Sequence, residues 1–293
     1  MAQPKPVDHA YKESAQGDFS FTSDDFDRIA ALLHQESGIH LQKSKASLVY
    51  SRLAKRLRAL RIESFRDYCK LVGEDSAERM NMLAALTTNV TRFFREPHHF
   101  EHLKASVLPP LLEAARRGGS VRLWSAGCSS GQEPYSIALT VLSMMPEAAS
   151  RDIRILATDI DPNMVARGRS GVYDPGELRD LPAEMKRRWF VPADGGPGSL
   201  GVADDLRALV AFRPLNLIAA WPMRGPFHAI FCRNVVIYFE ESTQSTLWGR
   251  IVPLLAPGGC LYIGHSERVT GPALAALDSV DITTYRIRSG ARA

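Results

Sequence analysis

A short turn of small residues is the part of this chain best suited to chemistry. Gly127, Ser129 and Gly131 separate a hydrophobic strand predicted for residues 121–124 from a predicted helix whose first turn holds Glu133 and a proline. In an open α/β sheet such a turn lies at the carboxyl end of a strand, where backbone N–H groups point outward and ligands bind. The spacing therefore predicts a ligand site or an exposed nucleophile here.

The pattern of the turn excludes two kinds of site and leaves three interpretations. The dinucleotide pattern G-x-G-x-x-G needs a glycine where Ser129 stands, and a phosphate-binding P-loop needs a Gly-Lys-Ser/Thr run that is missing. Gly127, Ser129 and Gly131 do match G-x-S-x-G, the nucleophile elbow of α/β-hydrolases. Small residues at these positions also suit a nucleoside-binding turn of the S-adenosylmethionine type. A tight strand-to-helix connection without a ligand is the third interpretation.

The strand predicted for residues 153–161 ends in two carboxylates. Asp159 is well placed to accept hydrogen bonds from ribose hydroxyls, because it lies at the tip of the strand after a glycine turn. Asp161 precedes a proline and a predicted helix, so we expect it to cap that helix. A hydrolase would need an Asp and a His at later loop tips; His228 and His265 exist, but no glycine run before the turn could form an oxyanion hole. These residues favour the nucleoside site and leave the hydrolase as an alternative.

Composition narrows the class of protein. The 293 residues suggest one large or two modest domains, and a formal charge of only +4 argues against a general polyelectrolyte binder. The four cysteines (Cys69, Cys128, Cys232 and Cys260) show neither C-x-x-C pairing nor metal-site spacing. They predict reduced thiols in a cytoplasmic protein and no metal site. Neither a signal peptide nor an apolar run of bilayer length is present, so no membrane insertion is expected.

The segment from Phe19 to about Arg95 has a helical pattern. Phe26, Ile29, Leu32 and Leu33 recur at helical spacing, and Ser23 with Asp24 is expected to cap this first helix. A second helix is predicted for residues 44–60. Its expected buried stripe consists of Leu48, Val49, Leu53, Leu57 and Leu60.

The second predicted helix also carries a run of basic residues. Lys43, Lys45, Arg52, Lys55, Arg56, Arg58 and Arg61 follow one another with no acidic residue between them. Such a run is either a solvated helix face or a docking surface that attracts an acidic partner. Nucleic acid is disfavoured, because no aromatic residues are interleaved there for base stacking.

A mixed polar and aromatic segment joins the helical region to the glycine turn. In residues 87–100, Asn89, Thr91 and Arg95 flank the pair Phe93-Phe94. This mixture is typical of a segment packed on one side and facing a ligand on the other. An ordinary interdomain helix is the alternative.

Five segments together resemble the chemotaxis receptor methyltransferase (CheR) family. They are T-N-V-T-R-F-F-R-E (88–96), W-S-A-G-C-S-S-G-Q-E-P-Y-S (124–136), A-T-D-I-D (157–161), C-R-N-V-V-I-Y-F (232–239) and I-G-H-S-E (263–267). The resemblance implies an α/β fold: a class I methyltransferase (Rossmann-like) doubly wound sheet, a small all-helical N-terminal domain and an inserted antiparallel β-subdomain. The implied boundaries are a disordered tail at 1–18, a helical domain at 19–90, a linker at 91–119, and a methyltransferase domain at 120–293 with its insertion at about 172–213.

The resemblance also implies an activity and a set of site residues. The family transfers a methyl group from S-adenosylmethionine to glutamate side-chain carboxylates of chemoreceptors, releasing S-adenosylhomocysteine. The implied catalytic residues are Arg95, beside the transferred methyl, and Tyr238, facing the acceptor. The implied cofactor-binding residues are Asn89, Thr91, Arg95, Glu133 near the methionine part, Asp159 on the ribose, Asn216 and Leu217 near the adenine, Arg233 and Asn234.

The implied partner is the cytoplasmic helical bundle of a chemoreceptor, docking through the basic helix at 44–60. The β-subdomain is a possible site for a tether at the receptor C-terminus. A nucleic-acid methyltransferase is the alternative enzyme, although the segment from Arg233 to Tyr238 lacks the Asn/Asp-Pro-Pro-aromatic run of amino-group methylases. A non-catalytic regulator that binds S-adenosylmethionine is the remaining alternative.

Overall fold

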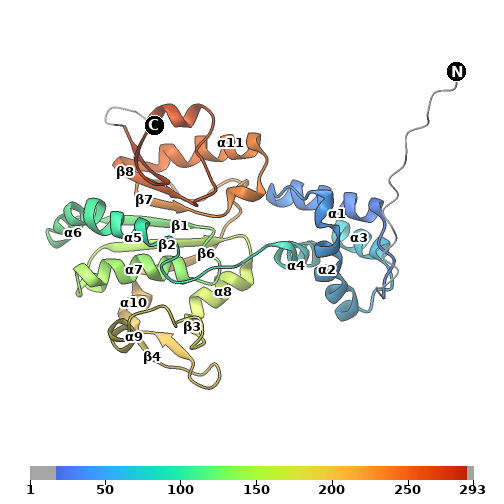
Figure 1. Ribbon diagram of the computed structural model, residues 1–293, viewed down its shortest axis with the longest axis horizontal. Helices are drawn as coiled ribbons and strands as arrows, with labels where there is room; N and C mark the ends of the chain where they lie inside the picture. The colour runs from blue at the N-terminus through green and yellow to red at the C-terminus, as the bar shows by residue number, and fades with distance from the viewer. Residues whose placement is uncertain (1–17, 289–293) are drawn as a thin grey trace. The chain divides into compact units, whose positions relative to one another are not determined.

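The computed structural model describes residues 18–288, which form two compact units divided after Thr87 (Figure 1). The disorder predicted for residues 1–18 therefore lies outside the described residues, except for Asp18. None of the helices in residues 18–288 is both long and apolar enough to cross a bilayer.

The first unit is built from helices, as the sequence predicts. They are α1 (Ser23–Ser37), the 3₁₀ turn η1 (Lys43–Lys45), α2 (Ala46–Leu60), α3 (Phe65–Glu74) and α4 (Ser76–Leu86). Their apolar faces enclose one core that includes Phe26, Leu33, Leu53, Phe65 and Tyr68.

Two details of this unit differ from the sequence prediction. The cap of α1 is Thr22 rather than Ser23 with Asp24: the Thr22 side chain accepts from the Asp25 N–H, and the Asp25 carboxylate accepts from the Thr22 N–H at 2.9 Å. This reciprocal pair is a capping box, which Ser23 and Asp24 cannot form from inside the first turn.

The buried stripe of α2 is also narrower than predicted. Val49, Leu53 and Leu57 are fully buried, but Leu48 and Leu60 are 41% and 38% exposed. Leu48 lies about 100° around the helix from Val49. Leu60 is the last helical residue before the left-handed Arg61, beyond the packed part of the helix.

The second unit is built on a seven-stranded sheet in the order β6-β2-β1-β7-β8-β10-β9 (Figure 1). Its strands are β1 (Val121–Ala126), β2 (Ile153–Asp159), β6 (Val210–Pro214), β7 (Phe227–Cys232), β8 (Leu255–Ile263), β9 (Leu277–Asp281) and β10 (Thr284–Ile287). The first five are parallel, and β10 and β9 close one edge in antiparallel fashion. The helical segments that accompany this sheet include α5 (Pro97–His102), the π-helical η2 (Leu103–Val107), α6 (Leu108–Arg116), α7 (Gln132–Met144), α8 (Pro162–Ser170), α10 (Asp204–Ala208) and α11 (Glu241–Ile251). The doubly wound sheet predicted from the sequence is confirmed.

The strand order places a topological switch point at β1. From β1 the chain moves outward to β2 and β6, and then returns to β7 on the other side of β1. Ala126 at the end of β1 pairs with Thr158 of β2 and with Cys232 of β7, so three strands end at the same edge. Ligands of open α/β sheets bind at this kind of position.

A second sheet, in the order β3-β5-β4, is inserted after α8. Its strands are β3 (Val172–Tyr173), β4 (Phe190–Pro192) and β5 (Leu200–Val202), and the short helix α9 (Ala183–Trp189) precedes β4 (Figure 1). The turn-rich loop 193–199 joins the antiparallel strands β4 and β5 as a hairpin. The small sheet ends at residue 202, and the following β6 pairs with β2 of the large sheet.

Candidate active site

The glycine turn is folded tightly against the end of β2. Gly127, Ser129 and Gly131 all have positive φ, at 82°, 48° and 99°. A Cβ atom at Gly127 would lie 2.3 Å from Cγ2 of Val235, so only glycine fits there. The N–H groups of Gly127 and of the next residue both donate to the Thr158 carbonyl at 2.8 Å. Main-chain hydrogen bonds thus hold the turn at the switch point.

Ser129 has a structural partner in place of a catalytic base. Its hydroxyl donates to the backbone carbonyl of Asn89 at 2.9 Å. A nucleophile elbow would direct this hydroxyl toward a histidine. This contact removes the hydrolase interpretation.

The two carboxylates after β2 divide into a strand-tip residue and a helix cap. Asp159 accepts one backbone N–H on each oxygen, from Ser129 at 2.8 Å and from Asp161 at 2.9 Å. Burial raises the pKa of Asp159, although these N–H groups favour the anion. Asp161 caps α8 by accepting from the Asn163 N–H, and its other oxygen accepts from the Asn89 amide at 3.1 Å. The predicted cap is confirmed, and the assignment of Asp159 to ribose stays a prediction.

The segment around Arg95 is held in an unusual conformation. Phe94 and Glu96, on either side of Arg95, have φ of 50° and 58°, which is rare for residues other than glycine. The Phe94 N–H donates to the Ser136 hydroxyl at 2.9 Å, and the Arg95 carbonyl accepts from Arg233 Nη2 at 2.5 Å. Backbone in this region persists only where surrounding contacts hold it, and such residues concentrate at functional sites. The main chain at Arg95 is therefore held by Ser136 on one side and by Arg233 on the other.

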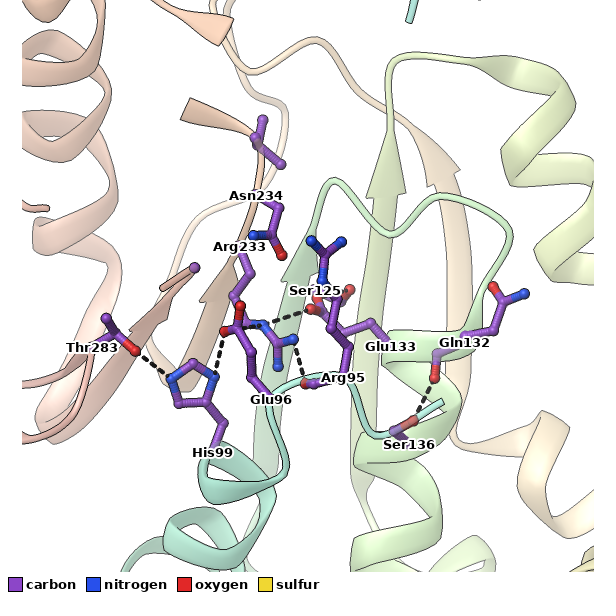
Figure 2. A network of polar contacts seen from close by, with 12 residues as sticks. Arg95, Glu96, His99, Ser125, Gln132, Glu133, Ser136, Arg233, Asn234 and Thr283 are labelled. Carbon is purple, nitrogen blue, oxygen red and sulfur yellow. Dashed lines mark hydrogen bonds and ion pairs between the residues drawn. The ribbon is translucent and has the colours of Figure 1, made fainter. Parts of the chain in front are cut away.

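A buried charge cluster supports this segment (Figure 2). The Arg233 side chain is 1% exposed, and its Nε lies 3.3 Å from Glu133 Oε2 and 3.7 Å from Glu96 Oε2. Glu96 Oε1 accepts from Nδ1 of His265 at 2.9 Å, and Glu133 Oε1 accepts from the Ser125 hydroxyl at 2.7 Å. One cation thus faces two carboxylates at the tip of β7.

The two carboxylates differ in pKa. Burial raises the pKa of Glu133, and the nearby Arg233 and Ser125 only partly offset it. Burial acts in the same direction on Glu96, but the hydrogen bonds from His265 and the charge of Arg233 outweigh it and lower the pKa of Glu96. Glu96 is therefore the carboxylate more firmly ionised beside Arg233.

A buried histidine completes the cluster as a neutral group. His99 has no exposed side-chain surface, and its Nε2 lies 2.9 Å from the Thr283 hydroxyl. Burial lowers the pKa of His99 to about 3, with the charge of Arg233 acting in the same direction. At neutral pH this imidazole therefore adds no charge to the two carboxylates and the guanidinium.

Glu267 ties the loop after β7 to the end of β8. Its carboxylate accepts from the backbone N–H groups of Asn234, Val235 and Val236 at 2.9 Å and of Gly264 at 2.6 Å. A carboxylate with several N–H donors is a strong local brace. No role is predicted from the sequence for Glu267 or Glu96, and His265 is considered there only as the histidine of a hydrolase, although each stands in a segment that carries the family resemblance.

The remaining predicted residues lie on loops around the same edge. Asn216 caps its own turn by accepting from the Ile218 N–H at 3.1 Å, and the buried Leu217 follows it. This turn adjoins Asp159, whose carbonyl accepts from the Leu215 N–H at 2.9 Å. Half-buried Thr91 lies between Asn89 and Arg95. Tyr238 ends the 3₁₀ turn η4 (Val236–Tyr238), and the N–H of Val236, the first residue of this turn, donates to Glu267.

This edge of the sheet fits a nucleoside that carries an amino acid. The positive φ of Gly127 keeps the turn tight at the end of β1, and Asp159, which accepts from the Ser129 N–H of this turn, brings a carboxylate to the same place. Within residues 18–288, Arg233 Nη1 is a buried donor without a hydrogen-bond partner, as a carboxylate-binding group would be before its ligand arrives. The donor and acceptor set therefore suits S-adenosylmethionine.

Comparison with known protein families agrees with this geometry. Residues 89–285 match the S-adenosylmethionine-binding domain of CheR methyltransferase, and residues 24–87 match the all-alpha domain of the same family. The chain belongs to the CheR methyltransferase family. Its cofactor is S-adenosylmethionine, and the second unit is the S-adenosylmethionine-binding methyltransferase domain of this family.

Several curated members of the family are similar over most of the chain. A probable chemotaxis protein methyltransferase of Rhizobium etli is 54% identical over 258 residues, covering 87% of this chain and 96% of that protein. Chemotaxis protein methyltransferase 2 of Pseudomonas aeruginosa is 43% identical and covers 85% of this chain and 88% of its own length. The chemotaxis protein methyltransferase of Escherichia coli is 43% identical and covers 83% of each chain.

Proposed function

We propose that this CheR-family protein transfers the methyl group of S-adenosylmethionine to glutamate side chains of chemoreceptors, in the cytoplasm, as part of chemotactic adaptation. The names of its relatives support the pathway. The observation that carries the proposal is the main chain around Arg95, which Ser136 and Arg233 hold at the edge where β1, β2 and β7 end. A guanidinium there suits a carboxylate acceptor, because its planar fork matches carboxylate geometry.

The cofactor would be held by groups from each strand end. Asp159 would accept from the ribose hydroxyls, and Asn216 and Leu217 would border the adenine. Arg233 would bind the cofactor carboxylate through Nη1, a donor without a hydrogen-bond partner among residues 18–288. Glu133 would lie near the methionine part, and Asn89, Thr91 and Asn234 would also contact the cofactor. When bound, the cofactor supplies an electrophilic methyl group on a positively charged sulfur.

The reaction needs orientation more than proton transfer. A glutamate with an ordinary pKa of about 4.3 is already ionised at pH 7, so its oxygen is a ready nucleophile without a general base. Arg95 would align this oxygen with the methyl group; such alignment is worth about 7–11 kcal/mol in well-oriented systems. Arg95 Nη1 already donates to the Val90 carbonyl at 3.0 Å, which moderates its hold on the acceptor. A moderate hold avoids overstabilising the ground state. Tyr238 would line the acceptor side.

The basic helix α2 would dock the receptor, but fewer of its basic residues are available for docking than the run in the sequence suggests. Arg52 donates to the carbonyls of Leu86 and Thr87 at 2.8 Å, and Arg56 pairs with the buried Glu78. These two arginines join α2 to α4 inside the first unit. Reversing their charge would damage the fold, whatever their role in docking.

The docking surface is therefore assigned to the exposed cations Lys45, Lys55, Arg58 and Arg61. Replacing Lys55 and Arg61 together by Glu should raise the KM for receptor while leaving the affinity for S-adenosylmethionine unchanged. Raising the salt concentration should weaken receptor binding by the wild type, since exposed charges are screened within about 10 Å at 0.1 M. A double variant with unchanged receptor KM would remove this surface from the proposal.

The activity itself is tested by incubating the protein and labelled S-adenosylmethionine with the cytoplasmic fragment of a chemoreceptor. Methyl label in base-labile esters is expected, and replacing the acceptor glutamates by Ala should abolish it. Label in RNA or DNA would identify a nucleic-acid methyltransferase. Tight cofactor binding with no transfer to any receptor fragment would identify a non-catalytic regulator.

A further inference from the structure

The inserted three-stranded sheet reaches the glycine turn through a buried tyrosine. Tyr173, in β3, is 1% exposed, and its hydroxyl donates to the carbonyl of Ser130 at 2.8 Å. A Cβ atom at Gly131 would lie 2.7 Å from the same hydroxyl. The turn and the insertion are therefore packed together with no space for a larger residue at this position.

A second contact runs from the insertion to the start of α7. Glu177 Oε1 accepts from the Gln132 side-chain amide at 3.1 Å and from Arg167 Nη2 at 2.7 Å. The Gln132 amide oxygen in turn accepts from the Ser130 hydroxyl at 2.8 Å. Ser130 is thus connected to the insertion through both its backbone and its side chain.

The insertion also supports the segment that carries Arg95. The ring of Phe93 packs edge-to-face against Tyr173 and Phe190, with centroids 5.1 Å and 5.9 Å apart. Phe93 is 3% exposed and lies two residues before Arg95. One tyrosine therefore contacts both the cofactor turn and the Arg95 segment.

We propose that Tyr173 is a positioning residue for S-adenosylmethionine and that the inserted sheet is a structural wall of the cofactor site. The proposal depends on the placement of the cofactor at the Gly127–Gly131 turn proposed above. Ser129 in that turn has a φ of 48°, a conformation that surrounding contacts must maintain in a residue other than glycine. Tyr173 supplies one such contact from outside the large sheet.

The expected effect of losing Tyr173 is on binding rather than on the chemical step. Without the hydroxyl, the Ser130 carbonyl loses its buried donor and the turn is no longer preorganised for the cofactor. Replacement of Tyr173 by Phe keeps the ring that packs against Phe93, and it leaves the hydrogen bonds of the Arg95 segment with Ser136 and Arg233 unchanged. The affinity for cofactor should therefore fall while kcat stays nearly constant.

Tyr173→Phe tests the proposal, with Tyr135→Phe as a matched control. Tyr135 is fully buried and donates to the Gly168 carbonyl at 2.9 Å, so its replacement also removes one buried hydroxyl and its hydrogen bond. The Tyr135 hydroxyl bonds α8 and not the turn. Calorimetry with S-adenosylhomocysteine should show a Kd about three- to tenfold higher for Tyr173→Phe and within twofold of wild type for Tyr135→Phe. The KM for S-adenosylmethionine should rise in parallel, with kcat within twofold.

Thermal unfolding separates positioning from general destabilisation. Both variants should unfold at similarly lowered temperatures, since each leaves one buried carbonyl without its donor. Equal loss of affinity in both variants, or no loss in Tyr173→Phe, would overturn the proposal while leaving the proposed function intact. Failure of the wild type to bind S-adenosylhomocysteine at all would refute this proposal together with the proposed cofactor site.

Discussion

The two halves of the switch point are built from different interactions. At the tip of β2, each oxygen of Asp159 accepts one backbone N–H, and the glycine turn is held largely by main-chain hydrogen bonds. At the tip of β7, Arg233 sits among Glu96 and Glu133 at 3.3–3.7 Å, and its Nε and Nη1 lack hydrogen-bond partners within residues 18–288. The first half is suited to hold a ligand of fixed shape. The second half holds the Arg95 segment in place, and its Arg233 keeps buried N–H groups available to donate to a ligand.

Arg95→Ala should produce the largest effect, and on the chemical step. Loss of the orienting guanidinium should lower kcat by about 100-fold or more, because small misplacements of reacting groups cost this much. Arg95→Lys should keep the charge but lose the planar fork, and should remain impaired. The control is Arg92→Ala, an exposed arginine of the same segment. Methylation assays at saturating cofactor measure kcat, and a wild-type rate for Arg95→Ala would contradict its role.

Glu96→Gln should weaken the charge interactions at the tip of β7 that hold the Arg95 segment. The change removes the carboxylate that is firmly ionised beside Arg233 and that accepts from His265. We expect about tenfold lower kcat and a loss of about 1–3 kcal/mol in the free energy of unfolding, since the buried Arg233 loses one of its two carboxylate partners and His265 loses a charged acceptor. Glu101→Gln, an exposed residue of α5, is the control. Urea unfolding and steady-state kinetics measure the two effects. A variant with wild-type kcat would show that this carboxylate does not position Arg95.

Asp159→Asn should weaken the hydrogen bonds at the tip of β2 and lower the affinity for the cofactor. An Asn amide would direct N–H groups toward the N–H donors of Ser129 or Asp161, and it would lose the charge that ribose hydroxyls favour. The Kd for S-adenosylhomocysteine should rise about tenfold. Asp161→Asn is the control, because Asn also caps helices and Asn89 can rotate its amide to pair with it. Calorimetry on both variants would contradict the proposed division of roles if Asp161→Asn had the larger effect.

The sequence predicts the β2 half better than the β7 half, for a physical reason. The glycine turn, the strand tip at Asp159 and the cap at Asp161 lie within about 35 residues and follow local rules of turns and caps. At the tip of β7, Arg233 bonds Arg95, which is 138 positions away, and His265 bonds Glu96, which is 169 positions away. No local pattern in the sequence shows that these residues meet. The same limit affected α2, where Arg52 and Arg56 form part of a surface run in the sequence but bond α4 in the fold. The contact between Tyr173 of β3 and the glycine turn is likewise not predicted from the sequence, since Tyr173 stands in no recognised motif.

Glu133→Gln should have the smallest effect, and its sign is opposite to that of Glu96→Gln. Burial raises the pKa of Glu133, so the folded protein favours its protonated form and the ionised form destabilises the fold at neutral pH. Glu96 still balances Arg233 after the change, so no unpaired buried charge is created. Glu133→Gln should therefore raise the stability at pH 7 by about 1 kcal/mol, or roughly 2–4 °C in Tm.

The pH dependence follows from the same shift. As the pH falls toward the ordinary carboxyl value of 4.5, wild-type Glu133 binds a proton in the folded state first, and the difference between wild type and variant should shrink. Below that value it should vanish. Thermal unfolding of both proteins between pH 7 and pH 4 measures this convergence. A variant less stable than wild type at pH 7 would show that Glu133 stabilises Arg233 as strongly as Glu96 does, and the distinction between the two carboxylates would be lost.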